Sequence, residues 1–245
     1  MIYFIIPIFN EEKNIPSLAN ELLNFTFEEE YFFIFSDDGS SDNTINCLKT
    51  VFPQNRLRIL GDGLNRGPGY AFDSAFEWVL QNSKNQEDII ITMEADCTSD
   101  LKILPNMIAI NKLGFDLVLA SVYSQGGGFD STNLFRKSLS YIANLLFRFL
   151  FKTQVQTISS FYRVYNVSLI KKIKASNDKI ISEYGFICML EILLKSIICR
   201  ANIIEVPMIL NSSKRKGKSK MKILKTTFEY FRFFFKYQKI KSNKF

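Results

Sequence analysis

Two carboxylates separated by one residue, Glu94 and Asp96, follow an apolar run at residues 89–93. Such a run is typical of a buried parallel strand, and at its end both acids can reach one cation. Hard divalent cations take oxygen ligands and usually share them with substrate phosphates. The pair therefore predicts a Mg²⁺ or Mn²⁺ site beside a diphosphate, and two ordinary surface acids are the alternative interpretation.

A second acidic pair, Asp37 and Asp38, follows the apolar run at 31–35. Adjacent carboxylates repel each other unless hydrogen-bond donors or a ligand satisfy them, and a nucleobase or ribose would do so. Solvated acids before a capped helix are the alternative. The segment from Pro7 to Glu11 is likewise compatible with a ligand loop or with a plain strand-to-helix turn.

Two further segments suit phosphate. Arg66 and Gly67 precede a helix expected at 68–80, where glycine permits close backbone approach and a helix N-terminus favours anions. No GxGxxG or Walker pattern occurs in the chain, which makes the usual dinucleotide and P-loop sites poor interpretations. The basic run from Lys214 to Lys220 suits a diphosphate or a lipid phosphate, with a solvated charge run or a nucleic-acid patch as the alternative.

The composition restricts the acid–base chemistry. The chain of 245 residues has no histidine, which excludes Ser-His and Cys-His nucleophile pairs, histidine-ligated zinc and a histidine base. Its four cysteines form no CxxC pair, so we expect a reducing compartment and buried thiols that act as small apolar residues. Proton transfer must come from carboxylates, lysine, tyrosine or the substrate itself.

These motifs require a framework that brings strand ends together. Apolar runs alternate with segments of helical periodicity, which predicts an α/β fold with a mostly parallel central sheet and helices on both faces. In such sheets ligands lie outside the carboxyl ends of the strands. The expected strands are 2–6, 31–35, 57–60, 89–93, 115–120 and 158–165, with an extended segment at 201–209. One helix is expected to begin after a cap at Asn14, and a second to follow cap residues at 40–42 and end at residue 48. Further helices are expected at 68–80, 101–111, 135–151, 184–198 and 223–239.

Charge is divided unevenly along the chain. Residues 211–245 hold 12 Lys/Arg and one acid, whereas residues 1–210 hold 19 Lys/Arg and 23 acids. A basic tail on a mildly acidic body indicates a phosphate-bearing ligand, anionic lipid or nucleic acid. The last expected helix mixes many aromatic residues with Lys and Arg, which suits an interfacial membrane helix; aromatics docked in the core are the alternative. We place the boundary between body and tail at residue 210.

The N-terminus favours a chain without a leader. The start MIYFIIPIFNEE has no basic region before its apolar residues, so we expect no signal peptide. No run approaches the roughly 20 apolar residues that a spanning helix needs. We therefore expect a cytoplasmic protein, peripheral at the cytoplasmic face of a membrane through its C-terminal amphipathic helix.

Taken together, these motifs resemble the family 2 glycosyltransferases with the GT-A fold, a Rossmann-like architecture of nucleotide-diphospho-sugar transferases. The matching features are P-x-[YF]-N-E at 7–11, DDGS-x-D-x-T at 37–44, the glycine-rich loop at Arg66 and the acidic pair. The branch that the chain resembles is that of dolichol-phosphate mannosyltransferase and the polyprenyl-phosphate glycosyltransferases, from about residue 2 to 222. The resemblance implies a UDP- or GDP-linked sugar donor.

The resemblance also implies roles for the matching residues. Asp96 would be catalytic and would ligate Mg²⁺ or Mn²⁺ together with Glu94. The residues that would bind the nucleotide sugar are Pro7, Phe9, Glu11, Asp37, Asp38, Arg66, Gly67 and Ala95. The residues that would bind the acceptor and the phosphates are Arg136, Ser140, Arg163, Arg215, Ser219 and Lys220. Three positions depart from the branch: Glu94 replaces the first Asp of DxD, Val122 replaces an arginine, and Thr98 stands where a Gln is frequent.

We expect inverting transfer, in which the acceptor attacks the anomeric carbon while the nucleoside diphosphate leaves, stabilised by the metal and the basic loop. A polyprenyl or dolichyl phosphate acceptor is already an anion and needs no protein base. A sugar hydroxyl needs one, for which Glu191 is the candidate.

The alternatives are a polysaccharide or glycolipid transferase with a hydroxyl acceptor and a non-catalytic nucleotide-binding scaffold. Nucleic acid is not expected as a partner, because the body is acidic and the aromatics are not spaced for base stacking; a homo-oligomer is left open.

Overall fold

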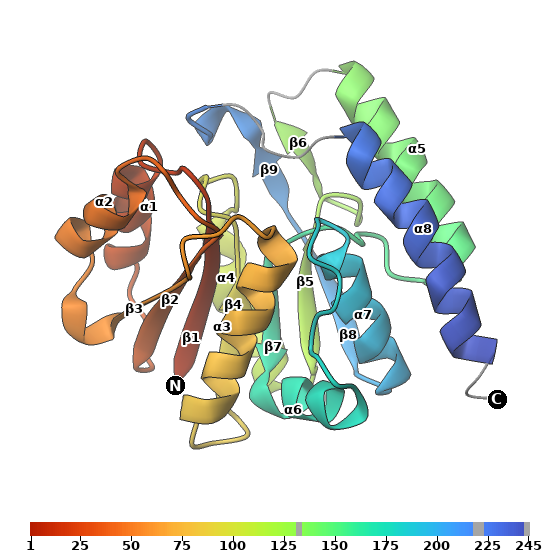
Figure 1. The fold of residues 1–245 in the computed structure, drawn as a ribbon, viewed down its shortest axis with the longest axis horizontal. Coiled ribbons are helices and arrows are strands. Elements are labelled where there is room, and N and C mark those ends of the chain that lie inside the picture. The colour runs from red at the N-terminus through yellow and green to blue at the C-terminus, as the bar shows by residue number, and fades with distance from the viewer. Residues whose placement is uncertain (131–133, 218–222, 243–245) are drawn as a thin grey trace.

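The computed structural model describes residues 1–130, 134–217 and 223–242 (Figure 1). Its strands are β1 (Ile2–Ile8), β2 (Tyr31–Asp37), β3 (Leu57–Leu60), β4 (Ile89–Thr92), β5 (Leu117–Ser121), β6 (Gly128–Asp130), β7 (Arg163–Asn166), β8 (Ile203–Pro207) and β9 (Ile209–Asn211). Its α-helices are α1 (Ile15–Leu23), α2 (Thr44–Val51), α3 (Pro68–Asn82), α4 (Leu104–Lys112), α5 (Leu134–Phe151), α6 (Val167–Ser176), α7 (Cys188–Ile198) and α8 (Ile223–Ser242).

Seven strands form one sheet in the order β3-β2-β1-β4-β7-β5-β8. Every neighbouring pair is parallel except the two that contain β7. The predicted mostly parallel sheet is therefore confirmed. The strand order reverses between β1 and β4, and ligands bind at such a reversal in open α/β sheets.

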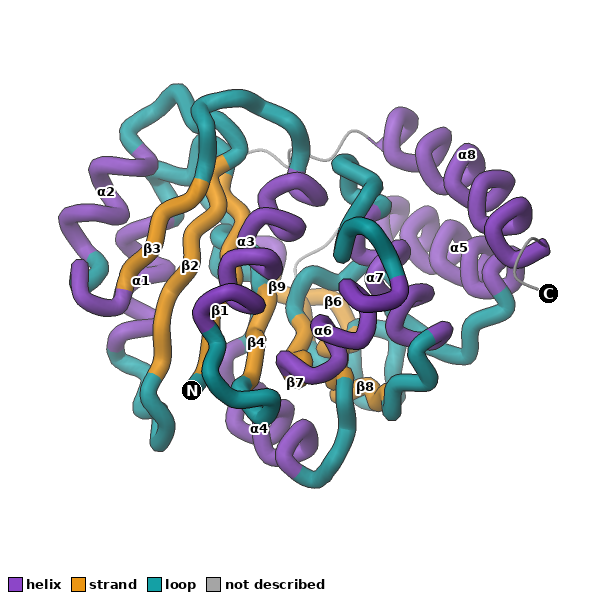
Figure 2. The backbone as a smooth tube through the Cα atoms, turned by 60° about the horizontal axis from the view of Figure 1, so that its bottom comes forward, coloured by secondary structure: helices purple, strands orange, loops and turns teal. Residues whose placement is uncertain are grey.

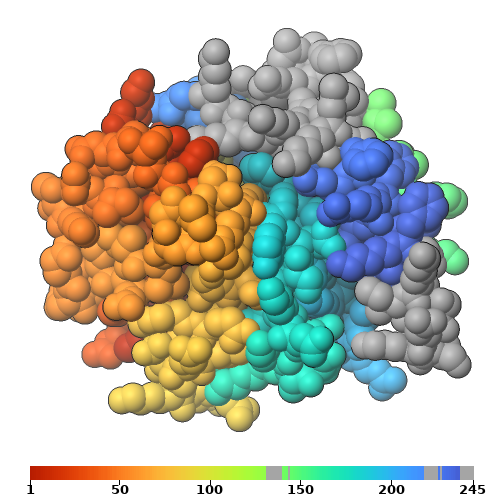
Figure 3. Space-filling view, viewed as in Figure 1, coloured from red at the N-terminus to blue at the C-terminus, as the bar shows by residue number. Residues whose placement is uncertain are grey.

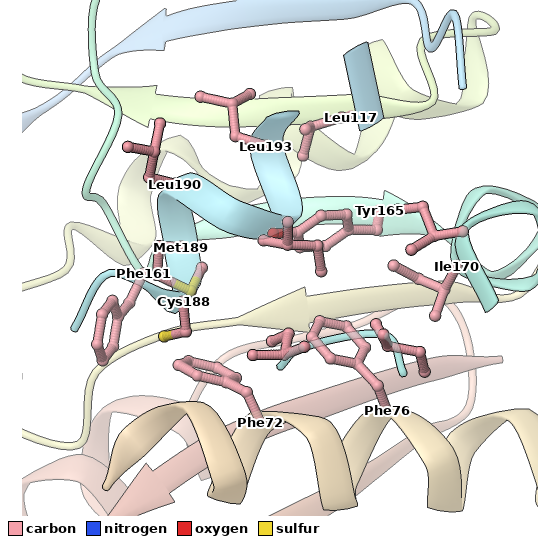
Figure 4. Close-up of a cluster of buried hydrophobic side chains, with 14 of the residues drawn as sticks. Phe72, Phe76, Leu117, Phe161, Tyr165, Ile170, Cys188, Met189, Leu190 and Leu193 are labelled. Carbon is pink, nitrogen blue, oxygen red and sulfur yellow. The ribbon is translucent and has the colours of Figure 1, made fainter. Parts of the chain in front are cut away.

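Helices cover both faces of the sheet (Figures 1 and 2). Strand β1 shows how the sequence builds the two layers, because successive side chains of a strand point to opposite faces. Phe4 and Ile6 join the cluster packed with α1, α2 and α4, whereas Tyr3 and Ile5 join the cluster packed with α3 and α7. Figure 4 shows part of this second cluster, where Phe72 and Phe76 of α3 face Tyr165 of β7 and residues of α7.

The second half of the chain departs from the prediction in three places. The strand expected at 158–165 is the shorter β7, and the helix α6 directly after it was not predicted. Helix α7 begins at Cys188 rather than at 184. The residues before Cys188 form a loop over the start of α3, where the Gly69 N–H donates to the Tyr184 carbonyl at 2.8 Å. That tertiary bond takes the place of a first helical turn.

Helices α5 and α8 lie side by side at the edge of the molecule, beyond β8 (Figure 1). Tyr230 and Phe233 of α8 are buried, and the rings of Phe147 and Tyr230 lie 4.4 Å apart between their centroids. The side of α8 that carries Tyr230 and Phe233 is therefore docked in the core, which was the alternative to a membrane-facing helix. Strand β9 crosses the boundary predicted at residue 210 and pairs with β6; the division into body and tail stays a prediction. Within the described residues, no helix has the length and apolar character needed to cross a bilayer.

Candidate active site

A cleft of about 1120 Å³ opens at the carboxyl ends of β1 and β4. It is bounded by the segments that follow β1, β2, β4 and β5, by the loop before α7 and by α8. The parallel direction of the strands explains why polar residues far apart in sequence meet here. Among the residues predicted for the site, the cleft is lined by Pro7, Phe9, Glu11, Asp38, Arg66, Gly67, Glu94, Ala95, Asp96, Ser140 and Arg215.

Asp96 is buried at the wall of the cleft, with 7% of its surface exposed. Its Oδ1 accepts from the N–H of Thr98 at 3.1 Å and from the Thr98 hydroxyl at 2.6 Å. Its Oδ2 lies 2.5 Å from both Nε and Nη2 of Arg215. Thr98, which departs from the resembled branch, therefore fixes the orientation of Asp96.

Glu94 lies two residues earlier on the same segment. Its Oε2 accepts from the Ser99 hydroxyl at 2.7 Å. Burial, and after it the charge of Asp96, raises the pKa of Glu94, because both effects disfavour the ionised form. A cation between the two carboxylates would relieve this repulsion.

The two acids fit a divalent cation that shares its ligands with a substrate. In the described part of the chain, no group of three or more His, Cys, Asp or Glu side chains is placed to hold a metal ion. Mg²⁺ is commonly bound by one or two carboxylates, with phosphates and water completing the shell. Glu94 and Asp96 supply that number of carboxylates, so the donor set suits a metal that arrives with a diphosphate.

A basic loop closes over Asp96. The Lys216 N–H donates to Oδ1 of Asn14 at 2.9 Å, and Nδ2 of Asn14 donates to the Lys216 carbonyl at 3.1 Å. This clip holds Arg215 against Asp96. The sequence predicted Asn14 as a helix cap, and Asn14 does occupy the N-cap position of α1, but its side chain makes no capping bond. No signal in the sequence connects Asn14 with a loop 202 residues away.

Asp38 shapes the glycine-rich loop from inside. It is 6% exposed, and its Oδ1 accepts from the N–H of Arg66 at 2.6 Å and from that of Gly67 at 2.8 Å. Burial raises the pKa of Asp38, partly offset by those two N–H groups. Asp37 does not line the large cleft: its carboxylate accepts from the Ser40 N–H at 3.1 Å beside a smaller cavity of about 310 Å³.

The glycines of this loop serve the protein's own packing. A Cβ on Gly67 would lie 2.4 Å from the Tyr184 carbonyl oxygen, and one on Gly69 would lie 2.0 Å from that of Glu183. The N–H groups at 66, 67 and 69 already donate to Asp38 and Tyr184. The predicted approach of phosphate to these N–H groups therefore does not fit this arrangement.

Arg163 does not face the cleft. It is fully buried, and its guanidinium donates to the carbonyls of Ser160 at 2.8 Å, Met189 at 2.9 Å and Ile158 at 3.0 Å. A guanidinium used in this way holds the chain before β7 against α7. The position argues against the predicted role of Arg163 in binding phosphate.

Glu191 is also placed away from the cleft lining. Its carboxylate accepts from the N–H of Ser182 at 2.9 Å and from that of Glu183 at 2.8 Å, and it forms an ion pair with Lys195 at 2.8 Å. The side chain is 5% exposed. These contacts fix the loop before α7 and argue against the predicted role of Glu191 as a general base.

The other predicted phosphate and acceptor residues are distributed differently. Ser140 is exposed on α5, with its hydroxyl 2.6 Å from that of Tyr123. Arg136 belongs to α5, but its side chain is not among those described. Ser219 and Lys220 lie outside the described residues.

An ion-pair cluster at the α8 wall was missed by the sequence. Glu183, whose side chain is 8% exposed, accepts from Nη2 of Arg232 at 3.2 Å and from Nζ of Lys236 at 2.6 Å. The i, i+4 spacing of the two cations indicated a common helix face, but nothing in the sequence pointed to the acid.

Comparison with known proteins agrees with this architecture. Residues 3–174 match the profile of Glycosyl transferase family 2. The chain is 26% identical over 220 residues to polyprenol monophosphomannose synthase of Mycolicibacterium smegmatis, covering 89% of this chain and 79% of that protein. It is 25% identical to dolichol-phosphate mannosyltransferase of Pyrococcus furiosus, covering 96% of this chain and 63% of that protein.

Solved structures share the fold at lower identity. Glucosyl-3-phosphoglycerate synthase from Mycobacterium tuberculosis superimposes with a TM-score of 0.61 at 15% identity, covering 90% of this chain and 73% of that protein. The same enzyme has been crystallised with Mn²⁺ and uridine-diphosphate-glucose. With most of its length matched by the family profile, the chain belongs to Glycosyl transferase family 2 and is a glycosyltransferase.

Proposed function

We propose that this glycosyltransferase moves a sugar from a nucleoside-diphosphate sugar to an isoprenoid phosphate at a membrane surface, with Mg²⁺ or Mn²⁺. The observation that carries the proposal is the carboxylate pair Glu94 and Asp96 in a cleft whose opposite wall is α8. The names of the relatives support an isoprenoid phosphate acceptor, and the crystallised neighbour supports a donor bound together with a metal.

The residues of the cleft suit departure of a diphosphate. A divalent cation held by Glu94, Asp96 and the diphosphate would neutralise charge on the leaving group. Arg215 and Lys216 add positive charge beside Asp96, where the leaving group would accumulate negative charge. Pro7 and Phe9 provide apolar surface at the end of β1 for the nucleoside.

The position of Glu191 favours a phosphate acceptor over a hydroxyl acceptor. A hydroxyl must lose a proton as it attacks, which requires a positioned base. Glu191, the predicted base, is instead saturated by two backbone N–H groups and Lys195. A phosphate monoester is an anion before it reacts and needs no such group.

The exposed apolar side chains of α5 and α8 support a peripheral membrane location. Monomeric proteins rarely expose large contiguous apolar patches without a binding role, and amphipathic helices rich in aromatics and Lys/Arg lie in the bilayer interface. We call these side chains the α5–α8 apolar face, each between 38% and 80% exposed: Tyr141, Ile142, Leu145, Leu146, Phe149, Phe228, Phe231 and Phe235.

Calorimetric titration tests the donor site. UDP, GDP and their sugar conjugates are titrated with Mn²⁺, with Mg²⁺ and with EDTA into the wild type, Asp96→Ala and the exposed control Asp178→Ala. We expect one nucleotide to bind only with metal, binding to be lost in Asp96→Ala, and the control to behave as wild type. Absence of binding for every nucleotide with metal present would refute the donor assignment. Transfer of radiolabelled sugar to a short isoprenoid phosphate then tests the acceptor.

A further inference from the structure

One buried carboxylate, that of Glu183, is shared by two cations of α8. It accepts from Arg232 and Lys236, which lie one helical turn apart. Glu229, three residues before Arg232 on α8, lies over Gly185 in the same wall of the cleft, so the two acids balance the charge of the two cations. What the cluster offers an anion is the remaining N–H donors of an oriented guanidinium.

Only one of the two cations lines the cleft. Arg232 belongs to its wall together with Thr226, Glu229 and Tyr230, whereas Lys236 does not. The Arg232 side chain is 65% exposed and contacts Glu183 through Nη2 alone. A guanidinium has five N–H donors in a planar fork, which suits two-point binding of a phosphate. Its contact with Glu183 orients the group and leaves most of these donors directed elsewhere.

The described cations of the cleft fall into two groups. Lys13, Arg66, Arg215 and Lys216 come from the loops that follow β1 and precede α3, and from the basic loop over Asp96. Arg232 comes from α8, which lies against the segment before α7 (Figure 3). The first group suits the donor diphosphate, so a second, separate cation fits a second phosphate.

The surroundings of Arg232 select the kind of phosphate. Phe228 and Phe235 lie four residues before and three residues after it, and both are more than 60% exposed. Residues at these spacings share one face of a helix. A ligand with a phosphate at one end and an apolar chain at the other matches a cation flanked in this way.

We propose that Arg232 binds the phosphate of the isoprenoid monophosphate acceptor, with Glu183 as the positioning residue and the α5–α8 apolar face receiving the isoprenoid chain. This proposal rests on the proposed function for the identity of the acceptor. Its geometric basis is independent of the donor site, because it involves neither Glu94 nor Asp96.

The test measures binding of farnesyl monophosphate, and of farnesol as the uncharged control, in zwitterionic phosphatidylcholine vesicles and again in vesicles that contain anionic lipid. The variants are Arg232→Gln, Arg232→Lys and Lys236→Gln, which removes the other partner of Glu183 but no cleft residue. We expect Arg232→Gln to weaken farnesyl monophosphate binding by roughly tenfold, the size of a lost charge-assisted hydrogen bond. Arg232→Lys should retain part of the affinity, Lys236→Gln most of it, and farnesol binding should not change.

Three results would overturn the proposal: equal weakening by Arg232→Gln and Lys236→Gln, no weakening by Arg232→Gln, or a loss confined to vesicles that contain anionic lipid. The first would mean that the cluster acts only by docking α8, and the last that Arg232 serves general attraction to a charged surface. Arg232-dependent binding in a protein that binds no nucleotide would refute the proposed function and support the phosphate site. Sugar transfer with acceptor binding insensitive to Arg232 would refute the site alone.

Discussion

Replacing Arg163 by methionine separates a structural role from the phosphate role that the resemblance implied. Methionine keeps a long apolar stem but removes every donor. The guanidinium is fully buried and donates to the carbonyls of Ile158, Ser160 and Met189. We therefore expect the variant to lose stability whether or not any phosphate is present.

The expected loss follows from those three bonds. A buried acceptor left without its partner costs about 1–3 kcal/mol, which gives about 3–9 kcal/mol for three carbonyls. Methionine avoids the cost of burying a charge, which is several kcal/mol, and within the described residues no carboxylate forms an ion pair with Arg163. The middle of the first range, less about 3 kcal/mol for the charge, gives a net decrease in the free energy of unfolding of about 3 kcal/mol. For a chain of this length that corresponds to about 10 °C in Tm.

Urea unfolding followed by circular dichroism measures this loss, with Arg58→Met as the control. Arg58 lies exposed on β3, so the same chemical change there should cost about 0.5 kcal/mol or less. If Arg163→Met unfolds at the same urea concentration as Arg58→Met, the carbonyl bonds do not hold this region. A weaker acceptor affinity with unchanged stability would instead restore the phosphate role.

Three further perturbations test other parts of the structure. Gly69→Ala should lower the free energy of unfolding by about 1–3 kcal/mol although alanine favours helices, because its Cβ would lie 2.0 Å from the Glu183 carbonyl oxygen. The control Gly128→Ala would meet nothing nearer than a side chain at 3.6 Å. It should unfold as wild type in the same urea titration. Phe149→Asp on α5 should reduce co-sedimentation of the protein with phospholipid vesicles. The control Leu113→Asp changes a residue that is equally exposed, at 80%, but lies at the end of α4, and it should not reduce co-sedimentation. Equal losses in the two variants would contradict a membrane role for α5. Burial raises the pKa of Cys188, which keeps its thiol protonated at pH 8.5, so iodoacetamide should label the partly exposed cysteines first and Cys188 only after unfolding. Peptide mass spectrometry distinguishes these cases, and labelling of native Cys188 at the unfolded rate would show that it is accessible.

The ends of the parallel strands were the part of the site that the sequence predicted best. Glu11, Asp38 and Asp96 follow three different strands, and all of them line one cleft. The reason is geometric: parallel strands in one sheet end at the same edge, so strand assignment alone places the residues that follow them. No side-chain detail was needed for that step.

The two residues that the sequence placed wrongly bind the protein's own backbone away from the cleft. Arg163 and Glu191 are polar residues within apolar stretches, a pattern that suits both a ligand contact and a bond to buried backbone. Apart from the Met189 carbonyl of α7, their partners are carbonyls and N–H groups of irregular loops. Those loops have no periodicity from which their unpaired backbone groups can be anticipated, so the partner of each side chain is decided by tertiary structure.

Asn14 shows how a local rule gives way to a tertiary contact. An N-cap asparagine normally accepts from an N–H in the first turn of its own helix. In α1 the Ile15 N–H already donates to the Glu11 carbonyl at 3.1 Å, and Pro16 has no N–H to satisfy. One of the two usual partners of a cap side chain is therefore absent, and both ends of the Asn14 amide bind Lys216 instead. The proline that indicated a helix start thus also removes one reason for the Asn14 side chain to stay on its own helix, and Asn14 holds the basic loop over Asp96.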